Sequence, residues 1–343
     1  MERQTVQSIV PFKKVLVTGG TGYIGSRVAL ELLRSGYSLR ILAKDMGKAE
    51  RLFGTSAEIM AGDIVDWRML NRALNGVDAV FHFAAALADR WYPFDHLRQV
   101  NVVGTRFLAE QSADQGVQRF FHMSTAWVYG IKGAGRKDEH SPLEASGLPY
   151  CDTKMEAESI VRDLVATKGL PAVILQPTQV YGPENYAWTA KPIELIKSGR
   201  MIYPNKGKGL LQPIYIDDLV QAIMLSVQRA RAGEAYILGG QELVTVKEFF
   251  DSYRKMLGKG WIPSMPAAVV LTFAKLMETG ASMLGMQTPF SVEAVRAVSS
   301  SVTYCCEKSE RELGFLPETL LEQGMTRVGE WLREKGTKLS HQQ

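Results

Sequence analysis

Two short stretches of the sequence combine a tyrosine with a lysine four residues later. They are "YCDTK" at 150–154 and "YCCEK" at 304–308. On a helix this spacing puts both side chains on one face, within reach of each other. A phenol has a pKa of about 10, and a nearby ammonium favours the phenolate, which suits proton transfer. The spacing alone does not choose between the copies, because chance supplies it easily in a chain with 12 tyrosines.

The elements that would position such a pair alternate along the chain. Short apolar runs predict buried strands at 14–18, 39–43, 57–61, 78–83, 119–124 and 172–177, with a late strand near 234–240. Amphipathic stretches predict helices at 23–35, 47–53, 66–75, 97–115, 150–168 and 214–230. Continuous apolar strands are typical of a parallel sheet covered on both faces, so the pattern predicts a doubly wound α/β (Rossmann) fold.

The alternation of predicted strands and helices ends after residue 177, and loops and helices interrupted by prolines follow. We predict a dinucleotide-binding domain formed by 1–180 with 213–240, and a smaller, mostly helical substrate-binding region formed by 181–212 with 241–335. The polar residues 336–343 are expected to form a flexible tail.

A glycine turn joins the first predicted strand to the first helix. Gly19, Gly22 and Gly25 lie in "TGGTGYIG" at 18–25. Here Gly19 permits a tight turn, Gly22 lets a pyrophosphate approach the backbone, and Gly25 lets the helix pack on the strand. The helix N-terminus then presents N–H groups to the anion. In this strand–turn–helix context the motif predicts dinucleotide binding.

The end of the second strand bears on which dinucleotide is bound. A carboxylate there would bind the ribose 2′-hydroxyl of NAD, but this chain has Ala43 followed by Lys44. A lysine is able to neutralise the additional phosphate of NADP, so the residues favour NADP, with NAD still possible. Asp45 is the nearest carboxylate that could reverse this preference.

Composition excludes several classes of protein. The net charge of +4 over 343 residues, without a Lys/Arg run, disfavours nucleic-acid binding. A spanning helix is not expected, because no 18 apolar residues run without a charge, and the N-terminus does not resemble a signal peptide. Three cysteines give no disulfide framework, and the five histidines form no ligand-spaced pair with them. We therefore expect a cytoplasmic protein without a metal site.

Seven motifs occur in an order that spans most of the chain. They are "TGGTGYIG" (18–25), "GDI" (62–64), "HFAA" (82–85), "NVVGT" (101–105), "STAWVYG" (124–130), "YCDTK" (150–154) and "QPTQVYGP" (176–183). Together they resemble the extended short-chain dehydrogenase/reductase superfamily, of the NAD(P)-dependent epimerase/dehydratase type. The resemblance implies an enzyme, and it rests on the whole series rather than on any single motif.

The resemblance also implies site residues. The catalytic residues would be Thr125, Tyr150 and Lys154, with Ser124 as an alternative to Thr125. Asp63 and Ile64 would lie beside the adenine, and Asn101 would steady the active-site backbone or a water. The implied cofactor-binding residues, with Lys44 from the strand end, are Gly19, Gly22, Tyr23, Ile24, Gly25, Lys44, Asp63, Ile64, Ala84, Ala85, Ala86, Asn101, Lys154, Pro177 and Thr178.

The same resemblance distinguishes the two tyrosine–lysine stretches. Residues 150–154 follow the fifth strand and open a long helix, which is the family position of the catalytic pair. Residues 304–308 lie beyond the whole sheet and lead into 306–317, which resembles a structural stretch of the family. We expect there a core tyrosine and a lysine on a helix surface.

The substrate is less clearly indicated. Nucleotide-sugar members of the family usually have Arg in place of Gln176 and Asn in place of Gln179, which weakens the case for a sugar diphosphate here. The segment 261–291 is apolar and resembles members related to 3β-hydroxysteroid dehydrogenases and dihydroflavonol reductases. It is expected to wall a hydrophobic pocket, to touch a membrane surface, or to pack against the sheet domain. Further apolar lining is expected from Trp91, Tyr92 and Phe94.

Three functions remain open at this point. The first is an NADP-dependent oxidoreductase that interconverts a hydroxyl and a ketone on a hydrophobic or aromatic small molecule. The second is a nucleotide-sugar epimerase or dehydratase that uses bound NAD(P). The third, a non-catalytic dinucleotide sensor, fits poorly with an intact Thr-Tyr-Lys set. The resemblance further implies a homodimer that pairs through helices 97–115 and 150–168.

Overall fold

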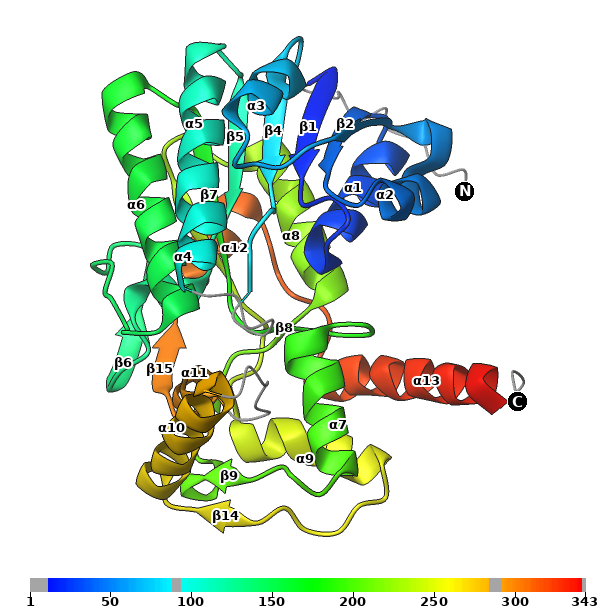
Figure 1. Cartoon of the computed structure of the whole chain (residues 1–343), viewed down its shortest axis with the longest axis vertical. Coiled ribbons are helices and arrows are strands. Elements are labelled where there is room, and N and C mark those ends of the chain that lie inside the picture. Colours follow the sequence, from blue (N-terminus) through cyan, green and yellow to red (C-terminus); the bar gives the residue numbers. More distant parts are fainter. Residues whose placement is uncertain (1–11, 88–93, 284–290, 341–343) are drawn as a thin grey trace.

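The computed structural model describes residues 12–87, 94–283 and 291–340, and its larger lobe is built on a parallel sheet (Figure 1). Seven strands are ordered β12-β7-β5-β4-β1-β2-β3. They are β1 (Lys14–Thr18), β2 (Ser38–Ala43), β3 (Glu58–Ala61), β4 (Ala79–His82), β5 (Arg119–Met123), β7 (Ala172–Pro177) and β12 (Ala235–Leu238). This confirms the predicted doubly wound α/β fold.

Helices cover both faces of the sheet. One face carries α1 (Tyr23–Arg34), α2 (Met46–Phe53) and α8 (Ile216–Arg229), and the other carries α3 (Trp67–Leu74), α5 (Thr105–Asp114) and α6 (Pro149–Lys168). Local signals set several of their ends. The side chains of Asp45 and Asp66 cap α2 and α3, and α6 ends at Gly169 in a left-handed conformation.

The region predicted as one helix over 97–115 is divided. It consists of α4 (Phe94–Arg98), a π-helical turn at Gln99–Gly104, and α5. A Cβ atom at Gly104 would lie 2.7 Å from Ile64, so the chain packs closely at this turn. The wider turn carries Asn101, and π-helical turns often occur at functional sites.

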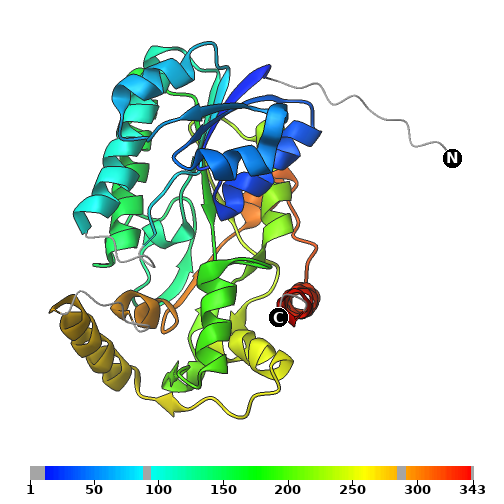
Figure 2. The ribbon, with the colours of Figure 1, turned by 45° about the vertical axis from the view of Figure 1, so that its right-hand side comes forward.

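The smaller lobe lies beneath the carboxyl ends of the sheet strands (Figure 2). Its helices are α7 (Lys191–Lys197), α9 (Val246–Met256), α10 (Ala267–Met283) and α11 (Val292–Ala297). Short strands join its segments: β8 (Val180–Tyr181) with β11 (Ile214–Tyr215), β9 (Tyr203–Pro204) with β14 (Ser264–Met265), and β10 (Leu210–Leu211) with β13 (Val244–Thr245). Because residues 214 and 215 form β11, α8 begins two residues later than predicted.

The chain then returns to the larger lobe. Strand β15 (Ser301–Tyr304) pairs in parallel with β6 (Ala134–Lys137), and α12 (Glu307–Leu313) contacts β12 and α8. This part of the region predicted to bind substrate therefore lies against the edge of the sheet.

The last helix, α13 (Leu321–Ser340), buries Met325 and Val328 in the core and contacts α9, and its far end projects outward (Figure 1). We predicted a flexible tail from residue 336, but the helix continues to Ser340, and 341–343 lie outside the described residues. Within the described ranges, neither α13 nor another helix is long and apolar enough to cross a membrane.

Candidate active site

The glycine turn is as tight as its spacing predicts. Gly19 has φ +69°, and the N–H of Gly22 donates to its carbonyl oxygen over 2.9 Å. A Cβ atom at Gly19 would lie 2.5 Å from the nitrogen of Ala84, and one at Gly25 would lie 2.3 Å from the oxygen of Gly19. Gly22 precedes α1 without a capping side chain. The turn therefore leaves backbone N–H groups at a helix start, which fits a dinucleotide pyrophosphate.

Tyr23 and Ile24, the other predicted residues of this turn, point into the protein. The Tyr23 hydroxyl lies close to Gly182, where an added Cβ would be 2.9 Å away, and Arg27 stacks on the Tyr23 ring. This hydroxyl is buried and has no hydrogen-bond partner among the described residues, and burial raises its pKa. Ile24 packs against the core of the sheet. Tyr23 thus connects the glycine turn to the segment that follows β8.

The residues that bear on cofactor choice lie together at the ends of β2 and β3. Lys44 is exposed, and its Nζ lies 2.8 Å from a carboxylate oxygen of Asp63. Asp45 accepts a hydrogen bond from the backbone of Lys48 over 2.9 Å and so caps α2. Ile64 packs inward against Gly104.

Asn101 fixes the loop after β4. Its side chain accepts from the N–H of Ala86 over 2.7 Å and donates to the oxygen of the same residue over 3.0 Å. A further bond joins it to Thr153 on α6. The π-helical turn therefore holds the segment of Ala84, Ala85 and Ala86 next to the glycine turn, and the contact is to backbone.

The predicted catalytic residues come from the segment just after β5 and from the first turns of α6. Thr125 lies two residues past β5 and accepts from the N–H of Trp127 over 3.4 Å. Tyr150 is half-buried in the first turn of α6, and Lys154 follows one turn later. The Lys154 ammonium donates to the oxygen of Met123 over 2.6 Å. It therefore ties the Tyr150 helix to the strand that carries Thr125.

Burial lowers the pKa of the Lys154 ammonium. Lys154 is 3% exposed, and this desolvation lowers its pKa to about 8, while the Glu158 carboxylate acts in the opposite direction. His82 and His122 lie on neighbouring strands nearby, and burial together with the Lys154 charge lowers the pKa of each. Both imidazoles are consequently neutral at physiological pH.

The two histidines differ in their partners. His82 is hydrogen-bonded to Thr18 and Thr105 at 2.8 Å each. His122 has no hydrogen-bond partner on either ring nitrogen among the described residues, and its ring centroid is 5.5 Å from that of His82. His82 thus links β1 and α5 across the sheet.

Glu158 is a buried carboxylate that our sequence reasoning missed. It accepts from Ser124 over 2.5 Å, from Gln176 over 2.9 Å, and from Arg162 over 2.7 Å. The signal was available, because Glu158 follows Lys154 by one helical turn and therefore faces the same side of α6. It fixes the end of β5 and helps to keep Lys154 charged.

This network affects two earlier interpretations. Ser124 donates to Glu158, so its hydroxyl is engaged in the core, and the choice of Thr125 stays a prediction. Gln176 is fully buried and also bonds to Tyr129. Gln176 therefore belongs to the core network, and what its presence in place of Arg means for a sugar diphosphate stays a prediction.

The remaining cofactor residues lie at the end of β7. Pro177 is its last residue, and Thr178 follows it. The Thr178 hydroxyl donates to the oxygen of Gln212 over 2.5 Å, which joins this strand end to the segment before β11.

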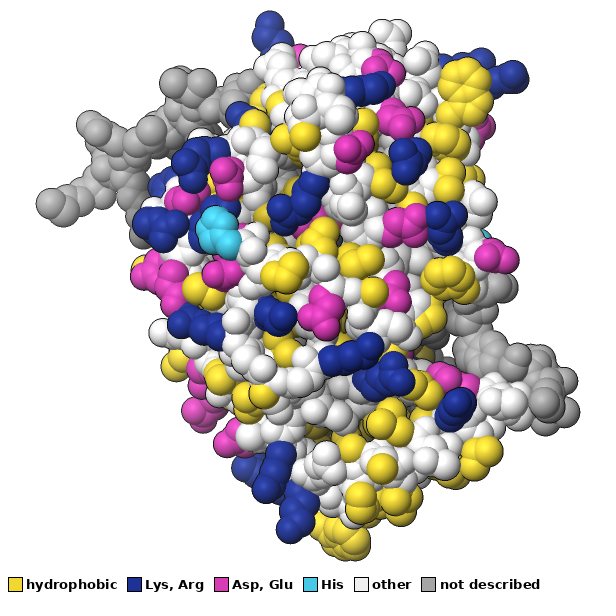
Figure 3. All heavy atoms as spheres, turned by 90° about the vertical axis from the view of Figure 1, so that its left-hand side faces the viewer, with side chains coloured by type: hydrophobic (Ala, Val, Ile, Leu, Met, Phe, Trp, Pro, Cys, Tyr) yellow, Lys and Arg dark blue, Asp and Glu magenta, His cyan; other side chains and the backbone are white. Residues whose placement is uncertain are grey.

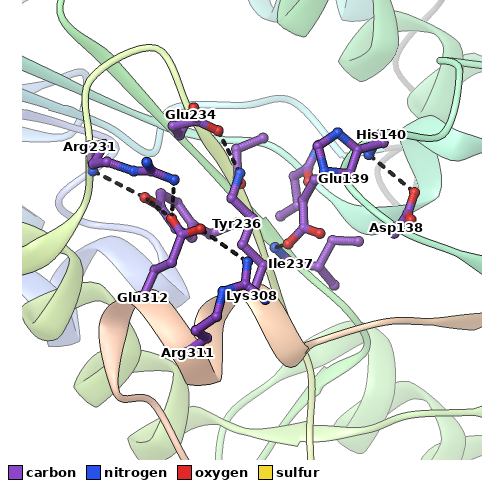
Figure 4. A network of polar contacts seen from close by, with 12 residues as sticks. Asp138, Glu139, His140, Arg231, Glu234, Tyr236, Ile237, Lys308, Arg311 and Glu312 are labelled. Atoms are coloured by element: carbon purple, nitrogen blue, oxygen red, sulfur yellow. Dashed lines mark hydrogen bonds and ion pairs between the residues drawn. The ribbon is translucent and has the colours of Figure 1, made fainter.

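The second tyrosine–lysine stretch lies elsewhere. Tyr304 ends β15 and is buried, as predicted, but Lys308 lies on α12, so the pair does not share a helix. Lys308 is buried rather than on the helix surface. It donates to Glu234 over 2.6 Å and to the oxygen of Ala235 over 2.8 Å (Figure 4). The prediction of a surface lysine was wrong because α12 packs onto the edge of the sheet.

Cys151, next to Tyr150, contacts the smaller lobe. Its sulfur lies 3.7 Å from a carboxylate oxygen of Glu293 on α11. Burial raises the pKa of Glu293 to about 7. The start of α6 is therefore in contact with an acidic group that titrates near neutral pH. Of the expected aromatic lining residues, Phe94 is exposed, and Trp91 and Tyr92 lie outside the described residues.

Fold and side-chain geometry together define a nicotinamide-dependent enzyme of the extended short-chain dehydrogenase/reductase type. The chain belongs to the NAD dependent epimerase/dehydratase family, whose sequence model matches residues 15–239.

Relatives with several activities match most of its length. Sterol demethylase protein B of Methylococcus capsulatus is 29% identical, with 94% of this chain and 98% of the relative covered. A 4-hydroxy-2-methyl-3-oxo-4-farnesyl-3,4-dihydroquinoline-1-oxide ketoreductase of Stigmatella aurantiaca is 26% identical, covering 91% and 94%. Among solved structures, the dTDP-glucose 4,6-dehydratase DesIV of Streptomyces venezuelae, with NAD and TYD bound, is 27% identical with a TM-score of 0.76, covering 94% and 97%.

Proposed function

We propose that this protein is an NADP-dependent oxidoreductase that interconverts a hydroxyl and a ketone on a hydrophobic or aromatic small molecule. One observation carries the proposal: the buried Lys154, one turn after Tyr150 on α6, donates to the oxygen of Met123, the last residue of β5, and Thr125 follows Met123 by two residues. This arrangement supplies a proton donor, a charge that tunes it, and a hydroxyl that orients the substrate oxygen.

The chain's own groups would act in sequence during reduction. When bound, the nicotinamide supplies the hydride to the carbonyl carbon. Thr125 donates a hydrogen bond to the substrate oxygen, and Tyr150 gives it a proton as negative charge develops there. The Lys154 cation stabilises the phenolate that remains on Tyr150. Oxidation of an alcohol uses the same groups in reverse.

Lys44 supports NADP over NAD, because it is an exposed cation at the end of β2 that would exchange its ion pair with Asp63 for one with the additional phosphate, while Asp45 caps α2. We expect Lys44→Ala to weaken NADPH binding by about tenfold and to leave NADH binding unchanged, since the lysine would meet the additional phosphate. Lys48→Ala, on the exposed side of the same helix, is the matched control. Equal affinity of wild type and Lys44→Ala for NADPH would contradict this role.

A hydrophobic substrate is supported by the relatives whose names refer to a sterol and to a farnesyl compound. It is also supported by the apolar composition of 261–291. The test is a panel of hydrophobic and aromatic ketones with NADPH, followed by absorbance at the nicotinamide band. Net NADPH consumption with at least one ketone is the expected result.

A second function, nucleotide-sugar dehydration or epimerisation, is favoured by the similarity to DesIV. In that case the hydride returns to the sugar within one cycle, so NADPH is not consumed overall. Conversion of a nucleotide sugar without net cofactor consumption, together with inactivity on every ketone, would replace the first function by the second.

We also propose a homodimer that pairs through α5 and α6, on the family resemblance. The cytoplasm remains the expected compartment, and all three cysteines have free thiols. Light scattering on the purified chain tests the dimer, and a monomeric mass at micromolar concentration would contradict it.

A further inference from the structure

Helix α10 has an apolar face in the core and a second apolar face in solvent. Val270 and Ala274 are buried beside Val295 of α11. A separate set of exposed apolar side chains recurs at helical spacing along α10 and starts just before it. This set, which we name the α10 strip, consists of Met265, Val269, Phe273, Leu276 and Met277.

The strip is more exposed than ordinary packing of a helix requires. Phe273 is 46% exposed and Leu276 is 67% exposed. Positions 269, 273, 276 and 277 share one side of the helix, so their side chains form a continuous surface. Figure 3 shows hydrophobic side chains gathered at the lower end of this face, in the lobe that contains α10. Contiguous exposed apolar surface of this kind marks an interaction site.

A basic loop is fastened to the start of α10. The side chain of Asn205 accepts from the N–H of Ala267 over 2.8 Å, and the N–H of Lys206 donates to the Ser264 hydroxyl over 2.8 Å. Lys206 and Lys208 line a surface hollow together with Met265, the first residue of the strip. Two cations are therefore held beside one end of the apolar surface.

Helix α10 carries one lysine and one glutamate, Lys275 and Glu278. Between residues 257 and 279 the charged side chains are Lys259, Lys275 and Glu278. The Glu278 carboxylate accepts from the N–H of Val292 over 2.9 Å, so it faces α11. Lys206 and Lys208, which line the hollow with Met265, are the cations that the structure places at the strip.

We propose that the α10 strip docks on an anionic lipid surface, with its apolar side chains in the acyl–headgroup boundary and Lys206 and Lys208 at the lipid phosphates. An apolar helix face flanked by lysines has the chemistry of an interfacial helix. Anionic headgroups attract such cations. A second copy of this chain fits less well, because a two-fold contact through the strip would bring like charges together. The strip contains none of Thr125, Tyr150 and Lys154. Variants of the strip are therefore expected to lose lipid binding without losing the proposed enzymatic activity.

The test is co-sedimentation of the full chain with vesicles of phosphatidylcholine alone and of equimolar phosphatidylcholine and phosphatidylglycerol. Binding to the anionic vesicles is expected to be about tenfold tighter and to weaken with salt. The double variant Phe273→Glu with Leu276→Glu is expected to lose binding by about tenfold or more. Lys206→Glu with Lys208→Glu is expected to weaken binding to the anionic vesicles selectively.

The matched controls are Trp67→Glu and Leu316→Glu, which change apolar side chains that are 54% and 59% exposed elsewhere on the molecule. Both are expected to bind vesicles as the wild type does. The proposal is overturned if the wild type ignores anionic vesicles, or if the α10 double variant binds them unchanged. It is also overturned if light scattering shows that this variant converts a dimer to a monomer, which would assign the strip to a second copy.

Discussion

Residues 150–154 and 304–308 carry the same Tyr-Cys-x-x-Lys spacing, but they lie in different parts of the fold. In the first, both residues lie on α6 and the lysine reaches the end of β5. In the second, the tyrosine ends β15 while the lysine lies on α12 and bonds to Glu234 and to β12 (Figure 4). Both lysines are buried, so burial does not distinguish them. What distinguishes them is which strand end the ammonium meets.

The largest expected effect on kcat comes from removing the Tyr150 phenol, with removal of the Tyr304 phenol as the comparison. Tyr150→Phe is expected to lower kcat by about 10²–10⁴-fold with NADPH affinity retained, because the proton donor is lost while the fold remains. Tyr304→Phe is the matched control and is expected to keep kcat near the wild-type value. Steady-state kinetics on the best substrate of the ketone panel, with NADPH titration by fluorescence, measures both. Comparable losses in the two variants would remove the distinction between the stretches.

Replacing each lysine distinguishes their two roles: the charge of Lys154 is expected to act on the Tyr150 phenol, and that of Lys308 to stabilise the fold. Lys154→Met is expected to lower kcat by about 10²-fold, because the phenolate loses its stabilising cation. Lys308→Met is expected to leave kcat unchanged and to lower the free energy of unfolding by about 1–2 kcal/mol, since a buried hydrogen bond to Ala235 and a part-buried one to Glu234 are lost. Denaturant unfolding and kinetics on both variants measure this. A loss of activity in Lys308→Met without a loss of stability would contradict it.

The pH dependence of kcat tests the role of the Lys154 charge. Burial lowers the pKa of Lys154 to about 8, so a step that needs its cation is expected to slow as pH rises through that value. Glu158 raises this pKa, and Glu158→Gln should therefore move the fall in kcat to lower pH. The full pH profile of kcat in both proteins is the measurement. Identical profiles would show that Glu158 acts through the structure alone.

The smallest expected effect is on stability and comes from Glu293, the carboxyl that contacts Cys151 in the first stretch. Burial raises the pKa of Glu293, beside Cys151, to about 7. A carboxyl whose pKa is higher in the folded state stabilises that state at low pH and loses this contribution as pH rises through about 7. Wild type should lose about 1–2 kcal/mol of unfolding free energy between roughly pH 5 and 8 that Glu293→Gln does not lose. Thermal melts across this range measure the difference, and parallel curves would rule it out.

Much of the larger lobe follows from local sequence. Seven apolar runs became the seven strands of the sheet, and the glycine turn formed between β1 and α1 as predicted. Local signals suffice there because strand burial, capping and glycine conformations depend on neighbouring residues. The predicted helix over 97–115 was less accurate, since the π-helical turn depends on contacts of Asn101 and Gly104 with distant segments.

The sequence by itself determined the spacing of Tyr150 and Lys154, the order of strands and helices, and the glycine turn, because these depend on residues close together in the chain. Tertiary structure alone decided that Gln176 and Lys308 are buried, that Glu158 joins Ser124 and Arg162, and that one face of α10 is exposed. Those outcomes depend on which elements pack together across long separations. A buried and a solvated side chain of the same type are identical in sequence, and packing is what gives them different chemistry.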